Sequence, residues 1–339
     1  MNASYELESL PAPPREGSVV SIGVFDGVHL GHLAILEANR ERARSLGAQP
    51  TVVTFRRHPK RVLLGREPRT LTSLEHRLEL FRRAGIEHTL VLTFDERLRE
   101  VSAEDFVRRL IEALGARAFV LGFDSKFGRD RRGTPALLQE LGLDVQVVDQ
   151  VVLDGRPVSS TAIREAVELG DLQGAERMLG RPVSVLGSVV RGDELGRRLR
   201  FPTANLDLHH ELHPPPGVYA GRARILDSEG RSEEPSRPPL HPAVINVGVR
   251  PTVAGRGPQP VRVEAHLLGF CADIYGRSVE LSFLERLRDE RRFASLEELS
   301  AQIARDVEHA REVLARGEAR SQGGAGGDAR GGAGAARLG

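Results

Sequence analysis

Cysteine is nearly absent from this sequence of 339 residues, in which Cys271 stands alone. A single thiol cannot build a disulfide framework or a cysteine-based zinc site within one chain. No apolar run approaches the roughly 18 residues that a membrane-spanning helix needs. Residues 1–15 also lack the apolar stretch of a signal peptide. Together these absences favour a protein of the reducing cytoplasm.

An excess of charge of one sign is also lacking. The chain has 48 Lys and Arg residues against 47 Asp and Glu residues, which gives a formal net charge of +1. This balance provides no general attraction to nucleic acid or to a membrane surface, so we expect neither as a partner. The length suggests two domains of roughly 100–200 residues each, and a hydrophobic content of 40% is enough for two cores.

In the first half of the chain, strand-like and helix-like segments alternate. Residues 1–16 are polar and proline-rich, and we interpret them as a leader or an edge segment. The alternation then predicts an α/β fold with a parallel sheet covered on both faces. The expected strands are 19–24, 51–55, 89–93, 118–121 and 145–148, and the expected helices are 33–46, 73–84, 103–114 and 135–141.

Beyond residue 180 the pattern changes to short β-like runs separated by turn residues, which predicts a small antiparallel barrel. The expected strands are 183–190, 217–226, 243–247, 261–268 and 278–283. Residues 228–242 form a proline-rich insertion, and 295–314 have the apolar spacing of a helix that packs on the barrel. We therefore expect domains at 17–180 and 181–316, and a disordered Gly/Ala-rich tail at 317–339.

The most informative stretch lies between the first expected strand and the first expected helix and contains Gly23, Gly27 and Gly31. Glycines let backbone approach a ligand closely, and the N-terminus of a helix offers free N–H groups to a phosphate. His29 and His32 are three residues apart and can face one pocket, where imidazoles can donate to phosphate oxygens as charge builds. The alternative is a plain turn with two surface histidines.

Two further segments are suited to a nucleotide. Residues 122–128, which contain Asp124, follow the fourth expected strand at its carboxyl end, although a solvated loop would also explain them. Ser160, Thr161 and Arg164 stand at the start of an expected helix, where hydroxyls, free N–H groups and a guanidinium make an anion site. An ordinary Ser/Thr helix cap is the alternative there.

The expected barrel has a constellation of its own. A run of glycines leads to residues 201–206, in which Thr203 and Asn205 point the same way if the stretch is extended. Hydroxyl and amide oxygens suit Mg²⁺, whereas a capped proline turn is the alternative. Glu264 and His266 share one face of an expected strand, and a strand carboxylate is more often simply solvated.

Taken in order, these motifs resemble the bacterial bifunctional riboflavin kinase/FAD synthetase family over residues 17–315. The matched segments are the H-x-G-H form at 29–32, S-S-T-x-x-R at 159–164, P-T-A-N at 202–205, the glutamate segment around Glu264 and D-I-Y-G at 273–276. The resemblance implies a Rossmann-like nucleotidyltransferase domain followed by a riboflavin kinase barrel with a C-terminal helix.

The resemblance also implies roles for individual residues. Glu264 would be the catalytic base of the kinase, His29 and His32 would be catalytic in the transferase, Thr203 and Asn205 would hold Mg²⁺, and Tyr275 and Arg288 would bind flavin. The implied contacts to ATP and its phosphates are Gly23, Phe25, Asp26, Gly27, Gly31, Asp124, Ser160, Thr161, Arg164, Gly187, Gly192, Gly196 and Arg197.

The implied reactions are phosphorylation of riboflavin to FMN by Mg-ATP, and adenylylation of FMN by a second ATP to FAD and pyrophosphate. The sequence departs from the family pattern at Arg56, Arg57, Ser125, Arg200 and Gly269. An enzyme with one activity and a flavin-binding regulator without catalysis are the alternatives, and self-association is left open. A pure regulator would not need to retain a base and both histidines.

Overall fold

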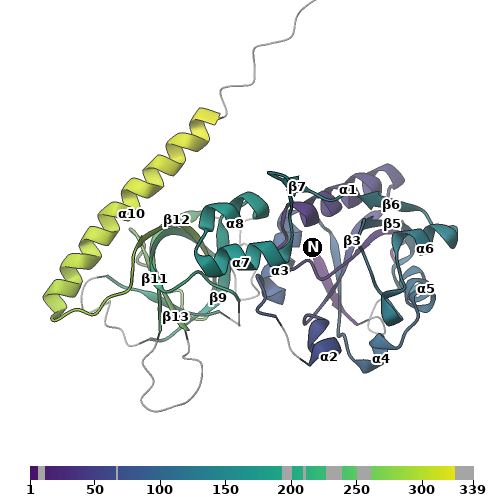
Figure 1. Cartoon of the computed structure of the whole chain (residues 1–339), viewed down its shortest axis with the longest axis horizontal. Coiled ribbons are helices and arrows are strands. Elements are labelled where there is room, and N and C mark those ends of the chain that lie inside the picture. Colours follow the sequence, from purple (N-terminus) through teal and green to yellow (C-terminus); the bar gives the residue numbers. More distant parts are fainter. Residues whose placement is uncertain are drawn as a thin grey trace, which may run out of the picture. The chain divides into compact units, whose positions relative to one another are not determined.

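The computed structural model describes residues 1–6, 12–65, 68–192, 201–208, 211–226, 239–249 and 261–324 (Figure 1). The chain divides into two compact units, each treated by itself below. Unit 1 comprises Met1–Gly187, Leu208–Pro215 and Leu226–Glu233, and unit 2 comprises Ser188–Asp207, Pro216–Ile225 and Glu234–Gly339.

Unit 1 contains a six-stranded sheet with the order β1-β4-β3-β2-β5-β6, in which every pair of neighbours is parallel. The strands are β1 Asn2–Tyr5, β2 Ser18–Ile22, β3 Gln49–Phe55, β4 His88–Leu92, β5 Ala116–Gly122 and β6 Val145–Val148. The predicted parallel sheet is confirmed, and the polar start of the chain supplies edge strand β1. Strand order reverses between β2 and β5, and in such sheets ligands bind beyond the carboxyl ends of the strands at that point.

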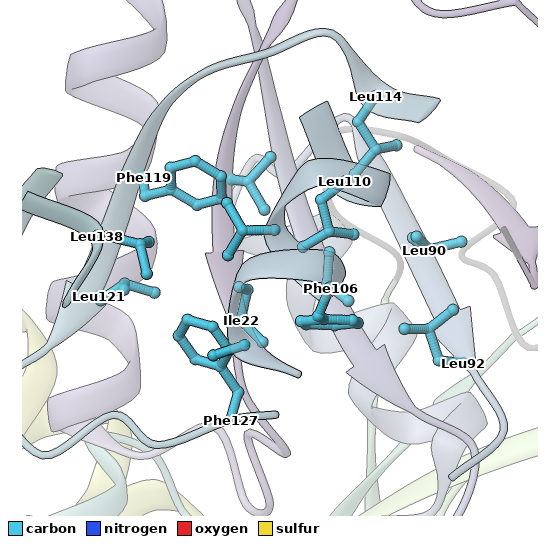
Figure 2. Close-up of a cluster of buried hydrophobic side chains, with 14 of the residues drawn as sticks. Ile22, Leu90, Leu92, Phe106, Leu110, Leu114, Phe119, Leu121, Phe127 and Leu138 are labelled. Atoms are coloured by element: carbon cyan, nitrogen blue, oxygen red, sulfur yellow. The ribbon is translucent and has the colours of Figure 1, made fainter. Parts of the chain in front are cut away.

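Helices cover both faces of this sheet because its buried strands alternate apolar side chains between them. Val19 of β2 packs with Ala43 of α1 (Leu30–Leu46), and α3 (Leu74–Arg83) adds Leu80 and Phe81 to a neighbouring cluster. The opposite face packs against α5 (Ala103–Leu114) and α6 (Pro135–Glu140). Figure 2 shows that cluster, which includes Ile22, Leu90, Phe106, Leu110, Phe119 and Leu138.

The remaining elements of unit 1 are short. They are the helices α2 (Lys60–Leu64), α4 (Glu96–Arg99), α7 (Ser160–Leu169) and α8 (Leu172–Leu179), a 3₁₀ turn at Arg129–Arg131, and the hairpin strands β7 (Val152–Leu153) and β8 (Arg156–Pro157). The basic segment 56–61 therefore ends in a helical turn. Helix α5 has the predicted bounds, since the Ser102 side chain accepts from Asp105 N and Gly115 ends the helix at φ 58°.

Unit 2 carries the predicted barrel, which is closed in the order β10-β13-β12-β11-β14-β9. The strands are β9 Val183–Val190, which begins in unit 1, β10 Ala204–Asp207, β11 Gly217–Ile225, β12 Leu240–Val249, β13 Val261–Leu267 and β14 Ser278–Arg288. The pairs β9–β10, β10–β13, β13–β12, β12–β11 and β11–β14 are antiparallel. Strand β10 was not predicted, because it is short and follows Pro202. Strand β12 begins at Leu240, inside the stretch expected to be an insertion.

Helix α10 (Leu296–Gly324) packs on the barrel through Val307, Ala310 and Val313. It continues ten residues beyond Leu314, where we expected it to end, and so includes residues 317–324 that we assigned to the tail. Residues 325–339 and most of the expected insertion, 227–238, lie outside the described residues. Within the described ranges, no helix has both the length and the apolar character needed to span a bilayer.

A buried carboxylate ties residues 208–215 into unit 1, although in sequence they lie between barrel strands β10 and β11. Glu211 is 2% exposed. Its carboxylate accepts hydrogen bonds from Ser73 N at 2.6 Å and from Leu186 N at 2.8 Å, and it lies 3.2 Å from His76 Nδ1. No pattern in the sequence led us to expect this return of the chain.

Candidate active sites

The loop between β2 and α1 has an unusual backbone. Phe25, Gly27 and Val28 have φ values of 53°, 83° and 40°. Positive φ is ordinary for glycine but uncommon for a β-branched residue such as valine. His29 is the N-cap of α1, and its Nδ1 accepts from His32 N at 3.4 Å. This turn aims both histidines toward the carboxyl edge of the sheet.

Asp26 holds the loop from inside the protein. Its carboxylate accepts hydrogen bonds from Leu71 N at 2.9 Å, Thr72 N at 3.1 Å and Arg164 Nη2 at 2.8 Å. Gly27 N donates to Thr72 Oγ1 at 3.0 Å, and Ser160 Oγ donates to the Asp26 carbonyl at 2.9 Å. Asp26, Gly27 and Arg164, which we predicted as phosphate contacts, thus also build the loop.

The two histidines stack with ring centroids 3.6 Å apart. Burial lowers the pKa of His29 to about 4, and the charges of Arg181 and Arg164 act in the same direction against Asp26. Burial first, and then His29, Arg77 and Arg181, lower the pKa of His32 well below its ordinary value. Among the described residues, the buried Nδ1 of His32 has no hydrogen-bond partner. Both rings are therefore neutral at pH 7 and can act as N–H donors.

A cavity of about 350 Å³ collects most of the residues predicted for a nucleotide. It also includes two that we did not predict, His58 and Lys60, from the segment after β3. That segment follows a strand at its carboxyl end, so the rule that found Asp124 could have found them. Gly23 and Gly27 are not in its lining. The predicted residues that line it are Phe25, Asp26, His29, Gly31, His32, Asp124, Ser160, Thr161 and Arg164.

A second cavity of about 500 Å³ shares Val24, His58 and Lys60 with the first. Its walls are largely apolar, and Gly23 lies among them. The aromatic and aliphatic side chains that line it include Phe55, Leu63, Phe94, Leu98, Phe106 and Phe127. The sequence did not lead us to expect this cavity, because its lining comes from five separate segments.

In unit 2, a cavity of about 160 Å³ is lined by Thr203 and Tyr275, together with Phe270, Cys271 and Ile274. Asn205 and Glu264 do not line it. They are paired directly across β10 and β13 and lie on the other face of these strands from Ala204 and Ala265, which do line it.

Arg262 lies beside this pair. Its Nε is 2.8 Å from Asn205 Oδ1 and 2.6 Å from Glu264 Oε1. Sequence reasoning missed Arg262, although it shares a strand face with Glu264 at a spacing of two residues. The structure thus brings the predicted base and one predicted metal ligand together, with a guanidinium between them.

The other residues predicted for the barrel differ in their surroundings. A Cβ on Gly192 would lie 2.2 Å from Asn205 Nδ2, so any larger residue there would displace the Asn205 side chain. Arg288 is bound by Asp306 of α10 at 3.0 and 2.8 Å and does not line the cavity with Tyr275. Gly187 is buried within β9, and Gly196 and Arg197 lie outside the described residues.

Unit 1 combines a parallel sheet with a glycine–histidine loop, and unit 2 combines a barrel with an Asn–Glu pair. These features define a two-unit protein suited to phosphate chemistry. The FAD synthetase family model matches residues 12–162, and the riboflavin kinase model matches residues 179–314. The chain is 38% identical to the bifunctional riboflavin kinase/FMN adenylyltransferase of Escherichia coli K12 over 314 residues, which cover 91% of this chain and 96% of that one. It belongs to this bifunctional family, and the predicted resemblance is confirmed.

Other comparisons agree on the family and the fold. The bifunctional enzyme of Pseudomonas fluorescens is 42% identical over 89% of this chain and 95% of its own, and that of Bacillus subtilis is 32% identical over 86% and 91%. The solved structure of a macrolide-efflux protein from Streptococcus pneumoniae is 29% identical, with a TM-score of 0.74 over 91% of this chain and 98% of that chain. The two-unit fold is therefore shared along nearly the whole length.

Proposed function

We propose that this chain phosphorylates riboflavin to FMN in its barrel and adenylylates FMN to FAD in its α/β part, using one ATP in each step. The family to which it belongs supports both activities. The observation that carries the assignment within the chain is the cavity of unit 1, where His29, His32, Ser160 and Thr161 meet. We assign the two activities to residues 17–180 and 181–316.

In the adenylyl-transfer step, the FMN phosphate is already ionised, so it attacks the α-phosphorus of ATP without needing a base, and pyrophosphate leaves. Alignment and stabilisation of developing charge are then the tasks of the protein. The neutral rings of His29 and His32 donate to the phosphoryl oxygens, and the first turns of α1 and α7 offer N–H groups. Lys60 supplies a cation, since the Arg164 side chain binds Asp26 and also donates to the Arg69 carbonyl.

The second cavity is suited to the flavin ring system. Phe55, Phe94 and Phe127 offer the apolar and aromatic contacts that a large planar ring prefers. It adjoins the histidine cavity through His58 and Lys60. A flavin ring bound there would have its phosphate at the shared wall, facing the site where we place ATP.

In the kinase step, Glu264 accepts the proton of the ribityl hydroxyl while that oxygen attacks the γ-phosphorus of ATP and ADP leaves. Asn205 carries an amide oxygen beside Glu264, and Thr203 carries a hydroxyl in the cavity with Tyr275. Both kinds of oxygen suit Mg²⁺, which in proteins usually keeps water and phosphate as its other ligands. The described residues contain no cluster of three His, Cys, Asp or Glu side chains for a metal, and such a cluster is not needed for an ion shared with ATP. Bound Mg²⁺ would neutralise phosphate charge.

One assay tests the proposal. The chain is incubated with riboflavin, Mg²⁺ and ATP, and the products are separated by chromatography. We expect FMN to appear first and FAD to follow. Product that stops at FMN, or FAD that forms only from added FMN, would reduce the function to one activity. Bound flavin without any product would favour the regulator.

A further inference from the structure

Arg181 contacts the back of the histidine loop. It lies between Gly180, which ends α8, and the start of β9. Its Nη2 donates to the Gly27 carbonyl at 2.8 Å and its Nη1 donates to the Val28 carbonyl at 3.1 Å. One guanidinium thus binds two consecutive carbonyls immediately before His29. Arg181 is not in the lining of the histidine cavity, so it acts from behind the site.

These two carbonyls belong to the strained part of the loop. Val28 has φ 40° and Gly27 has φ 83°. A β-branched residue at positive φ is strained and persists only where its surroundings hold it. The chain at Gly180 also passes close to the first residue of α1, which follows the loop: a Cβ on Gly180 would lie 2.6 Å from Leu30 Cδ2. The forked guanidinium is well shaped to hold this backbone.

Arg181 also contributes charge to the site. It is one of the cations that lower the pKa of His29 and of His32, although burial is the largest cause for both. Arg77 is a second cation near His32 and donates to the Val24 carbonyl at 2.6 Å, where the loop begins. The same guanidinium of Arg181 therefore influences both the backbone and the protonation of the histidines.

We propose that Arg181 is a positioning residue of the adenylyl-transfer step, which orients His29 and His32 by fixing the carbonyls of Gly27 and Val28. This inference rests on the proposed function of unit 1. Arg181 lies beyond the FAD synthetase match at 12–162 and inside the riboflavin kinase match at 179–314. The segment matched to one activity would thus supply a residue needed for the other.

The test uses three variants of the full chain. Arg181→Gln removes both the fork and the charge, and Arg181→Lys keeps the charge but loses the fork. Arg177→Gln is the matched control, because Arg177 lies on α8 one turn earlier and pairs with Asp154 at the surface, where both side chains are more than 60% exposed. FAD formation from FMN and FMN formation from riboflavin are measured separately for each, and the histidine resonances are titrated by NMR.

We expect Arg181→Gln to lower kcat for FAD formation by about 10²-fold, the cost of misplacing catalytic groups by about 1 Å. The KM for ATP in FAD formation should stay near its wild-type value. The rate of FMN formation from riboflavin should also stay near wild type. Arg181→Lys should lose activity without raising the pKa of His29, whereas Arg181→Gln should lose activity and raise it. Arg177→Gln should match wild type in all measurements.

Two results would overturn the inference. One is wild-type FAD formation by Arg181→Gln. The other is that, in both Arg181 variants, FAD formation and FMN formation fall equally and in proportion to the fraction of folded protein. That result would show general destabilisation. A wild-type chain that makes no FAD would instead overturn the proposed function of unit 1.

Discussion

The two sites are assembled by different kinds of structure. In unit 1 the cavity takes its residues from the segments after β2, β3, β5 and β6 and from the starts of α1 and α7. In unit 2, Asn205 and Glu264 are direct partners in one antiparallel ladder. A ladder positions such a pair by its own hydrogen bonds. Loops at the edge of a parallel sheet need additional contacts, and here these are made by Asp26 and Arg181.

The sites also differ in charge. Burial keeps His29 and His32 neutral beside several arginines, which suits donors to a phosphate. Glu264 is only partly buried and lies against Arg262, which suits a base that exchanges its proton with substrate and solvent. Because the two chemistries rely on different side chains, each site should respond to its own substitutions and not to those of the other.

The largest separation is expected from Glu264→Gln. The variant keeps the shape of the side chain but removes the base, so riboflavin phosphorylation should fall by about 10²–10⁴-fold. FMN supplied directly should still become FAD at the wild-type rate. Glu285→Gln is the matched control, because Glu285 lies on the same barrel and pairs with Arg316 at the surface. Unchanged phosphorylation by Glu264→Gln would show that another group is the base.

His32→Ala should have the opposite effect. Loss of one donor to a phosphoryl transition state costs about 10²–10³-fold in rate, so FAD formation from FMN should fall by that factor. FMN formation should be unaffected. His88→Gln serves as the control, since His88 is a buried histidine of the same sheet that contacts Ser4 and does not line the cavity. Equal loss of both activities in His32→Ala would contradict the separation of the sites.

The sequence predicted those parts of the fold and site that depend on contiguous residues. Helix α5 was predicted with its bounds because its cap, Ser102, and its terminator, Gly115, are adjacent to it in sequence. His29 and His32 were predicted to face one pocket because they are only three residues apart in the sequence. Strand β10 was missed because four residues beside a proline carry too little periodicity.

Contacts made by backbone atoms were beyond sequence reasoning. Asp26 is held by the N–H groups of Leu71 and Thr72, and Glu211 by those of Ser73 and Leu186. Nearly any residue type can supply an N–H group, so these partners leave no signature in the sequence. Arg181 was missed because its partners are carbonyls more than 150 positions away.

The lowered pKa of His29 also predicts that the stability of the protein depends on pH. The pKa of His29 is about 4 in the folded protein and 6.5 in the unfolded chain, so between these values the unfolded state binds a proton that the folded state excludes. His29 therefore leaves the free energy of unfolding at its full value above pH 6.5. As pH falls from 6.5 toward 4, this free energy decreases by about 1.4 kcal/mol per pH unit. The free energy of unfolding is measured by denaturant titration at pH 7, 6 and 5. It should fall less steeply with decreasing pH in His29→Gln than in wild type. Equal slopes would contradict a lowered pKa.

The smallest effect is expected at the end of the chain, where truncation should disturb neither site. The last buried side chain described in α10 is Leu314, and Arg316 beyond it only pairs with Glu285 at the surface. Deleting residues 321–339 removes no described buried contact, so the free energy of unfolding should change by less than about 0.5 kcal/mol and both activities should persist.

A second truncation after Asp306 makes this expectation decisive. It removes Val307, Ala310 and Val313, which pack on the barrel, and also Leu314, and each of these four side chains is less than 10% exposed. Loss of this apolar cover should destabilise the kinase half by several kcal/mol, at about 25 cal/mol per Å² of newly exposed surface. FAD formation from FMN should be affected much less, because its residues lie in unit 1. If the shorter deletion proved as damaging as the longer one, residues beyond 320 would have to contribute to folding despite their composition of mostly glycine and alanine.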